Sequence, residues 1–396
     1  MRPILLSLTT LLTIALVAMP CAAQEKPDAK PRARDLGVPF DGTPGPLNAI
    51  TDVAGVTVGH TTLISGEGKL VVGKGPVRTG VTAIFPRGKD IDDTGIFAGW
   101  WSLNGNGEMT GTTWVEESGI LTGPVMITNT HSVGVVRDAV IQWTVTHRKV
   151  GPDDDWWSLP VVAETWDGWL NDINGFHVTP EDAFHAIETS HGGPVEEGSV
   201  GGGTGMICNG FKGGIGTSSR KLSAKDGGYT VGVLVQCNYG RRQTFRVAGI
   251  PVGREIPNDD PYTFVPSDIA EHGSIIVVVA TDAPLLPHQL KRLARRVSLG
   301  LGRDGSISGN GSGDIFIAFS TANRGAAATD HTVDLKMMPN DMLDPVFEAT
   351  VEATEESIIN AMVAATSMTG IENHHVDALP HDQLRAILKK YNRLNQ

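Results

Sequence analysis

Apolar positions along the chain follow two different spacings. Short runs rich in Val, Ile and Thr, bounded by Gly, Asn and Pro, are typical of strands. They predict strands at residues 50–63, 80–88, 124–129, 275–280 and 314–320. Longer stretches with apolar residues on one helical face predict helices at 132–146, 179–190, 285–300 and 344–366. Because strands and helices mix without a steady strand–helix–strand rhythm, the pattern favours layered α+β architecture over a doubly wound sheet.

The first 23 residues have a pattern of their own. Arg2 precedes an apolar run that ends at Pro20, and small residues follow at positions 21–23. This order is typical of a secretory signal peptide. A lipoprotein signal through Cys21 is disfavoured, because proline is a poor residue just before a lipidated cysteine. We therefore expect a periplasmic or secreted protein that carries no membrane segment after processing.

The polar, proline-containing residues 24–35 predict a disordered leader. From residue 36 to 396 the chain has no repeat and no low-complexity linker. We therefore expect one folded domain in this range. With 396 residues, of which 40% are apolar, the chain can bury a substantial core.

The net charge of −12 argues against nucleic acid or anionic membranes as partners. Of the three cysteines, Cys208 and Cys237 lie outside the signal segment. An oxidising compartment permits a disulfide between them, but spacing alone does not show that they meet, and two buried thiols are the simpler expectation. Neither has metal-ligand spacing.

Several motifs suggest chemistry that the rest of the chain does not support. The glycine-rich run 198–216 lacks the Gly-Lys-Ser/Thr ending of a phosphate loop, which favours close-packed turns. Ser218 to Lys221 match the S-x-x-K pattern, but no Lys-Thr-Gly follows, so we expect a solvated loop. His374 and His375 form the tightest histidine cluster, and no metal array such as H-E-x-x-H occurs.

Gly273-Ser274 stands directly before the apolar run at 275–280. A buried strand has little use for a hydroxyl at its first position, so Ser274 is either the end of a loop or a new chain terminus. If the bond before it is cut, the α-amine of Ser274, with an ordinary pKa of about 8, can take the proton of its own hydroxyl. The glycine before it tolerates a strained backbone at the cleaved peptide.

The surroundings of Ser274 resemble a known family, the DmpA-like aminopeptidases. The resemblance is carried by NAITDVAGVTVGHTTL (48–63), AETWDGWLNDINGFHV (163–178), GGGTGMICNGFKGGIGTSSR (201–220), VLVQCNYG (233–240), GSIIVVVATDAPLLPHQLKRLARR (273–296) and GSGDIFIAFSTAN (311–323). These blocks occur in the family's order, and the resemblance as a whole extends from about residue 36 to 390. The family includes the L-aminopeptidase/D-esterase and the β-peptidyl aminopeptidases.

The resemblance implies a four-layer αββα sandwich, of the type shared with ornithine acetyltransferase. It implies self-cleavage between Gly273 and Ser274 into chains 24–273 and 274–396 that stay together. Family members form tetramers of the cleaved pair and need no metal or organic cofactor. The expected substrates are short peptides, amides or esters with a free amino end, and the sequence leaves L-α, D-α and β-amino acids as alternatives.

The resemblance also implies roles for six side chains. Ser274 is the expected nucleophile. Ser312 and Asp314 match a Ser-Gly-acid motif whose usual acid is glutamate, and Asn238 is the expected oxyanion donor. Glu164 is expected to bind the substrate's ammonium group, and Trp166 stands where tyrosine is usual. The remaining alternatives are an acyltransferase of the ornithine acetyltransferase type, whose nucleophile is threonine, and a non-catalytic periplasmic binding protein.

Overall fold

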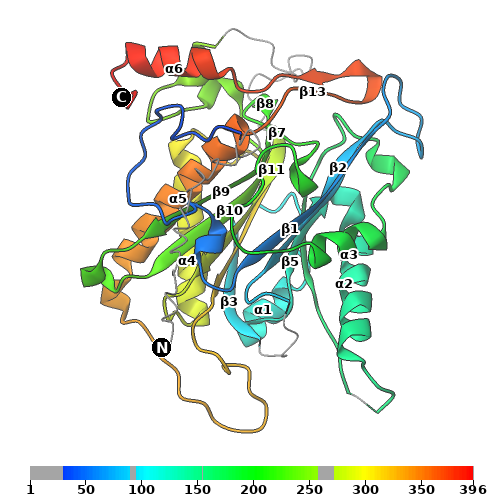
Figure 1. Cartoon of the computed structure of the whole chain (residues 1–396), viewed down its shortest axis with the longest axis vertical. Helices are drawn as coiled ribbons and strands as arrows, with labels where there is room; N and C mark the ends of the chain where they lie inside the picture. Colours follow the sequence, from blue (N-terminus) through cyan, green and yellow to red (C-terminus); the bar gives the residue numbers. More distant parts are fainter. Residues whose placement is uncertain (1–29, 90–94, 154, 257–271, 396) are drawn as a thin grey trace, which may run out of the picture. The chain divides into compact units, whose positions relative to one another are not determined.

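The computed structural model (Figure 1) describes residues 30–89, 95–153, 155–256 and 272–395. The chain divides into two units, residues 1–30 and Pro31–Gln396. All that follows concerns the second unit. The predicted signal segment and the first half of the predicted leader, residues 24–29, lie outside the described residues. No helix within the described ranges is long and apolar enough to cross a membrane.

A four-stranded sheet forms one half of the second unit. Its strands lie in the order β1-β2-β5-β6, and only the β5–β6 pair is parallel. Helices α2 and α3 cover its outer face (Figure 1). The bounds are β1 Thr57–Ser65, β2 Val77–Phe85, β5 Val125–Asn129, β6 Val161–Thr165, α2 Val133–Arg148 and α3 Pro180–Glu188.

A six-stranded sheet forms the other half, in the order β4-β3-β12-β11-β10-β9. Its central strands β11 and β12 run parallel, and their neighbours run antiparallel to them. Helices α4 and α5 cover its outer face. The bounds are β3 Ile96–Ser102, β4 Ile120–Leu121, β9 Gly214–Lys221, β10 Thr230–Asn238, β11 His272–Thr281, β12 Gly311–Ser320, α4 Pro287–Arg303 and α5 Asp344–Val363.

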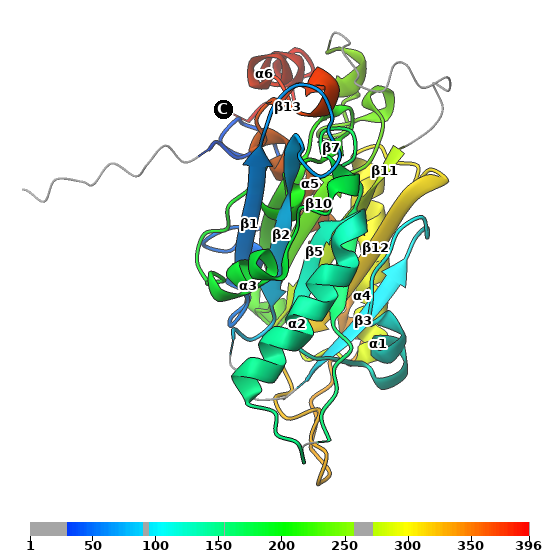
Figure 2. The same cartoon turned by 90° about the vertical axis from the view of Figure 1, so that its right-hand side faces the viewer.

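Period-two alternation in the strands produces separate cores. On β11, Ile275 and Val277 pack toward α4 and α5, whereas Ile276 and Val278 pack between the two sheets. Successive side chains of a strand point to opposite faces, so a continuous apolar run fills both layers. Figure 1 shows the two sheets face to face between two helical layers, and Figure 2 looks onto the layer of α2 and α3. The expected αββα sandwich is therefore confirmed.

Smaller elements complete the fold. Helix α1 follows β3, helix α6 lies near the C-terminus, and two short hairpins join β7 to β8 and β13 to β14. Their bounds are α1 Thr112–Ser118, α6 His381–Lys390, β7 Ile207–Cys208, β8 Phe211–Lys212, β13 Met368–Thr369 and β14 His375–Val376. The glycine-rich run 198–216 forms close-packed turns and short strands, as predicted.

All four predicted helices are present, with ends shifted by a few residues. The predicted strands are present too, but the first begins only at Thr57, because Ile50–Asp52 form a 3₁₀ turn. The loop predicted for Ser218–Lys221 is wrong. These residues end the buried strand β9, where Ser218 donates to the Ala353 carbonyl at 2.6 Å and Arg220 pairs with Glu356 at 2.8 Å. Partners from α5 make these polar side chains compatible with burial.

The leader prediction is wrong for its last residues. Ala33 is buried, and the guanidinium of Arg34 lies 2.7 Å from Glu356. This paired charge anchors the segment to α5, which the polar composition of residues 24–35 does not reveal. The expectation of two free thiols is also wrong. Cys208 and Cys237 form a disulfide, with their Cα atoms 5.6 Å apart.

Candidate active site

Ser274 lies near the start of β11, between two other strands of the six-stranded sheet. It pairs in register with Asn238 on β10 and with Gly313 on β12. Its hydroxyl oxygen accepts a hydrogen bond from the Gly313 N–H at 3.2 Å, and the residue is buried. By strand alternation it shares the face of Ile276, which points between the sheets.

Gly273 occupies a backbone position that only glycine fits. Its φ is +104°, outside the range that side chains allow. A Cβ atom there would lie 1.8 Å from the carbonyl oxygen of Asn238. Gly273 and Ser274 both belong to strand β11. The fold thus holds this peptide in a conformation that glycine tolerates and other residues do not.

The Ser-Gly-Asp motif of β12 lies directly beside this peptide. Ser312 pairs in register with Gly273. Its hydroxyl donates to the Asp314 carboxylate at 2.6 Å, and both side chains are buried. Aspartate therefore reaches Ser312 despite being one methylene shorter than glutamate. In register Asp314 lies opposite Ile275, one residue beyond the serine.

Asn238 is held by contacts at both ends of its amide. Its Oδ1 accepts from the Ile207 N–H at 2.8 Å, and its Nδ2 donates to the Trp166 carbonyl at 3.0 Å. An amide nitrogen carries two hydrogens, and these contacts use one of them. The Cys208–Cys237 disulfide joins the residues that follow Ile207 and precede Asn238. The side chain is a rigid donor at the end of β10, not a turn residue.

Glu164 comes from the other sheet, near the end of β6. One carboxylate oxygen accepts from the Glu108 N–H at 3.0 Å, and the other accepts from the Thr130 hydroxyl. Burial raises the pKa of Glu164, and these two hydrogen bonds partly oppose that rise. A buried, oriented carboxylate of this kind suits a single positive group.

Gly107 lies between Glu164 and strand β12. A Cβ atom at Gly107 would lie 3.2 Å from the Glu164 carboxylate and 3.2 Å from the Gly313 Cα. The absence of a side chain therefore lets the loop fit between the carboxylate on one sheet and β12 on the other. The six residues named from the sequence come from four strands and the turn after β6, and the structure brings them to the same end of the sandwich.

Trp166 is not a core residue. Its side chain is 41% exposed and lies over Gly168, and its backbone carbonyl is the partner of Asn238. The indole is therefore exposed at the surface, two residues after Glu164 in the sequence.

Sequence analysis missed the Asn-Gly-Asn-Gly loop at 104–107. Asn104 accepts from the Asp314 N–H at 2.6 Å and donates to the Gly309 carbonyl at 2.9 Å. Asn106 donates to the Gly311 carbonyl at 2.9 Å. This loop clamps the start of β12, and its only sequence signal is a turn-forming composition.

A buried carboxyl, Asp167, was also missed. Its side chain accepts from Asn171 at 3.1 Å, and burial raises its pKa from 3.8 to about 7. Thr79 and Asn129 face the same carboxyl and oppose the rise. Asp167 follows Trp166 directly, so it supports the turn that holds the Asn238 partner.

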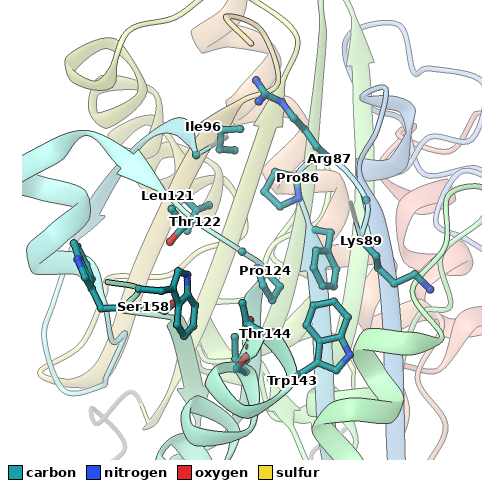
Figure 3. A pocket seen from close by; sticks show the side chains of 17 residues that line it. Pro86, Arg87, Lys89, Ile96, Leu121, Thr122, Pro124, Trp143, Thr144 and Ser158 are labelled. Carbon is teal, nitrogen blue, oxygen red and sulfur yellow. Dashed lines mark hydrogen bonds between the residues drawn. The ribbon is translucent and has the colours of Figure 1, made fainter. Parts of the chain in front are cut away.

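A pocket lined by aromatic side chains lies elsewhere. Trp143, Trp156 and Trp157 line it with Pro86 and Pro124 (Figure 3). It opens where β2 ends and β3 begins, near the last residues of β11 and β12. Ser274 lies seven residues back along β11, about 23 Å at roughly 3.3 Å per residue. This pocket is therefore separate from the Ser274 cluster.

Comparisons with known proteins agree with this geometry. Peptidase family S58 matches residues 48–376. The β-peptidyl aminopeptidase BapA of Sphingosinicella microcystinivorans is 58% identical over 378 residues, covering 92% of this chain and 93% of that protein. BapA of Sphingosinicella xenopeptidilytica is 48% identical over 398 residues, with coverages of 96% and 95%.

The solved L-aminopeptidase D-Ala-esterase/amidase of Ochrobactrum anthropi superposes with a TM-score of 0.86 at 49% identity. The match covers 92% of this chain and 100% of that one, which is described as a prototype serine aminopeptidase with a variant of the Ntn hydrolase fold. The chain therefore belongs to peptidase family S58, and it is a serine aminopeptidase with an Ntn-hydrolase fold.

Proposed function

We propose that Ser274 is the nucleophile and that cleavage of the Gly273–Ser274 bond activates it. The observation that carries this proposal is the conformation of Gly273, where φ is +104° and the Asn238 carbonyl leaves no room for a side chain. A strained peptide whose next residue carries a buried hydroxyl is suited to attack by that hydroxyl on its own preceding carbonyl.

Self-cleavage then takes two steps. The Ser274 Oγ attacks the Gly273 carbonyl carbon, the C–N bond breaks, and the nitrogen takes the hydroxyl proton to leave an ester. Water hydrolyses the ester, which gives a Gly273 carboxylate and a Ser274 with a free α-amine. Ser312 lies beside Gly273 in register, and its hydroxyl is hydrogen-bonded to Asp314, so we assign to it the transfer of the proton.

The same atoms then perform peptide hydrolysis. The α-amine of Ser274, whose ordinary pKa is about 8, accepts the Oγ proton as the oxygen attacks the substrate carbonyl. The second Nδ2 hydrogen of Asn238 stabilises the resulting oxyanion. The proton passes to the leaving amine, and water releases the acyl group in a second addition.

Glu164 selects substrates with a free amino end. Its fixed carboxylate pairs with the substrate ammonium group and thereby limits the enzyme to removing one residue at a time. Short peptides and amides are the substrate class, and the 58% identity to a β-peptidyl aminopeptidase supports β-amino acids at the first position.

Mass spectrometry and N-terminal sequencing of the purified protein test this proposal. We expect two chains, one of which begins at Ser274. Ser274→Ala should give one uncleaved chain and lower aminopeptidase activity by about 10³-fold or more. An uncleaved wild-type chain with full activity would rule the proposal out.

Export and assembly belong to the same proposal. The N-terminal pattern supports removal of residues 1–23 and a periplasmic or secreted location, and the family resemblance supports a tetramer of cleaved pairs. Sequencing of the larger chain after expression with its leader locates the first site. Light scattering on a size-exclusion column measures the assembly.

A further inference from the structure

Phe176 combines an exposed apolar side chain with an unfavourable backbone conformation. Its side chain is 69% accessible, the highest value among the large hydrophobic side chains in the described part of the chain. Its φ is +52°, a left-handed conformation that bulky residues seldom adopt. Strained and exposed residues of this kind are concentrated at functional sites, which is a reason to ask what the ring contacts.

The loop that carries Phe176 is firmly held. Asp172 accepts hydrogen bonds from His177 Nε2 at 2.8 Å and from the Gly73 N–H at 2.7 Å. Its backbone carbonyl also accepts from the Gly175 N–H at 3.0 Å. The exposure of Phe176 is thus imposed by an anchored turn and does not come from a loose loop.

The ring lies beside the proposed ammonium site. It stacks on His131, with ring centroids 6.2 Å apart and an angle of 23° between the planes. His131 directly follows Thr130, whose hydroxyl donates to the Glu164 carboxylate. The phenyl ring is therefore linked to the Glu164 site through His131, and most of its surface is open to a ligand.

The chemical structure of the substrate indicates which of its groups would contact the Phe176 ring. In an α-amino acid, and in a β-amino acid substituted next to its nitrogen, the side chain is bonded to the carbon that carries the amine. Pairing the ammonium group with Glu164 therefore fixes that carbon and directs the side chain to its immediate surroundings. An apolar surface there favours an apolar side chain by removing both from water.

We propose that Phe176, stacked on His131, is a specificity-determining residue that contacts an apolar side chain on the substrate's first residue. This inference rests on the proposed role of Glu164. It assigns the preferred substrates as leucine-like or aromatic first residues, in both the α series and the β series just described.

Phe176→Asn tests this inference, because asparagine accepts a left-handed backbone and removes the ring. The measurement is kcat/KM for leucyl and glycyl p-nitroanilides. We expect the leucyl-to-glycyl ratio to fall roughly tenfold, chiefly through KM for the leucyl substrate. The same loss should occur with a β-homoleucyl amide. Trp157→Ala, which removes a 58% exposed ring from the distant aromatic pocket, is the matched control and should leave the ratio unchanged.

An unchanged ratio in Phe176→Asn, or an equal loss on both substrates, would overturn the inference. The glycyl substrate separates this outcome from failure of the proposed function. Under the proposed mechanism, hydrolysis of the glycyl substrate needs Ser274 and Glu164 but no contact with a substrate side chain. If Ser274→Ala hydrolyses this substrate as fast as wild type, the mechanism is refuted, and the role of Phe176 is not.

Discussion

The two sheets of the sandwich differ in what they contribute to the active site. The six-stranded sheet carries the groups proposed to break the bond: Ser274, Ser312, Asp314 and Asn238. The four-stranded sheet carries Glu164 on β6, and its partner Thr130 directly follows β5 of the same sheet. Under the proposed mechanism, bond chemistry and substrate recognition are therefore built on separate sheets.

Rigid links join the two sheets. Gln236 on β10 donates to the Thr128 carbonyl at 3.0 Å and to the Thr165 hydroxyl at 2.8 Å, and Asn238 donates to the Trp166 carbonyl. A buried amide with these partners fixes the spacing of the sheets. The division predicts that changes in the six-stranded sheet act on cleavage and kcat, whereas changes in the four-stranded sheet act on KM.

The largest effect is expected from Gly273→Ala. The new Cβ would lie 1.8 Å from the Asn238 carbonyl oxygen, so the peptide cannot keep its conformation. We expect no chain separation on a denaturing gel and no activity. Gly228→Ala is the control, because Gly228 also has a positive φ but has open space around its Cβ position. Normal cleavage in Gly273→Ala would show that the strained geometry is not required.

Asn238→Asp comes next. Aspartate keeps an acceptor for the Ile207 N–H but removes the amide donor. We expect kcat to fall by about 10²-fold or more, the usual loss for one oxyanion donor, with a smaller change in KM. Near-normal kcat in protein that has been cleaved would contradict the division of labour between the sheets.

Glu164→Gln should act mainly on KM. Removing one partner of a buried charge pair costs about 2 kcal/mol or more, which corresponds to a rise in KM of about 30-fold. Glu108→Gln is the matched control, since Glu108 contacts Glu164 through its backbone N–H. A loss confined to kcat would place Glu164 in the chemistry instead.

Wild-type KM should also depend on pH. Glu164 binds the ammonium group as a carboxylate, and burial raises its pKa. Glu164 therefore becomes protonated, and KM rises, as the pH falls through a pKa that is higher than that of an ordinary glutamate. Glu164→Gln should remove this dependence, which steady-state kinetics across the acidic range would measure.

The smallest effect on activity is expected from Asp167→Asn. This variant tests whether Asp167 stabilises the turn after β6. Burial raises the pKa of Asp167 from 3.8 to about 7, so the folded protein holds this proton more tightly than the unfolded chain. Stability from this group is complete below the unfolded pKa and is lost as the pH rises toward 7, by up to about 1.4 kcal/mol per pH unit.

Denaturant unfolding of wild type and Asp167→Asn at several pH values between 4 and 7 measures this contribution. The free energy of unfolding should fall less steeply with rising pH in Asp167→Asn than in wild type. Asp226→Asn, at a partly exposed position, should keep the wild-type slope. Identical slopes in wild type and Asp167→Asn would mean that Asp167 is ionised throughout the range.

Much of the architecture could be predicted from local pattern. Apolar spacing predicts helix α4, and a continuous β-branched run predicts β11. Strand β9 could not be predicted in this way, because Ser218 and Arg220 look solvated until α5 supplies their partners. Satisfaction of buried polar groups depends on residues far away in the sequence.

The sequence by itself determined the strand and helix content, the family resemblance and the residues named for the site, because these depend on local composition and short motifs. Only the tertiary structure decided that Asn104 clamps Asp314, that Glu164 meets β12 through Gly107, and that Phe176 stands exposed beside His131. The physical reason is that these relations arise where two sheets stack, and stacking places side chains together by burial and hydrogen bonding and not by their order along the chain.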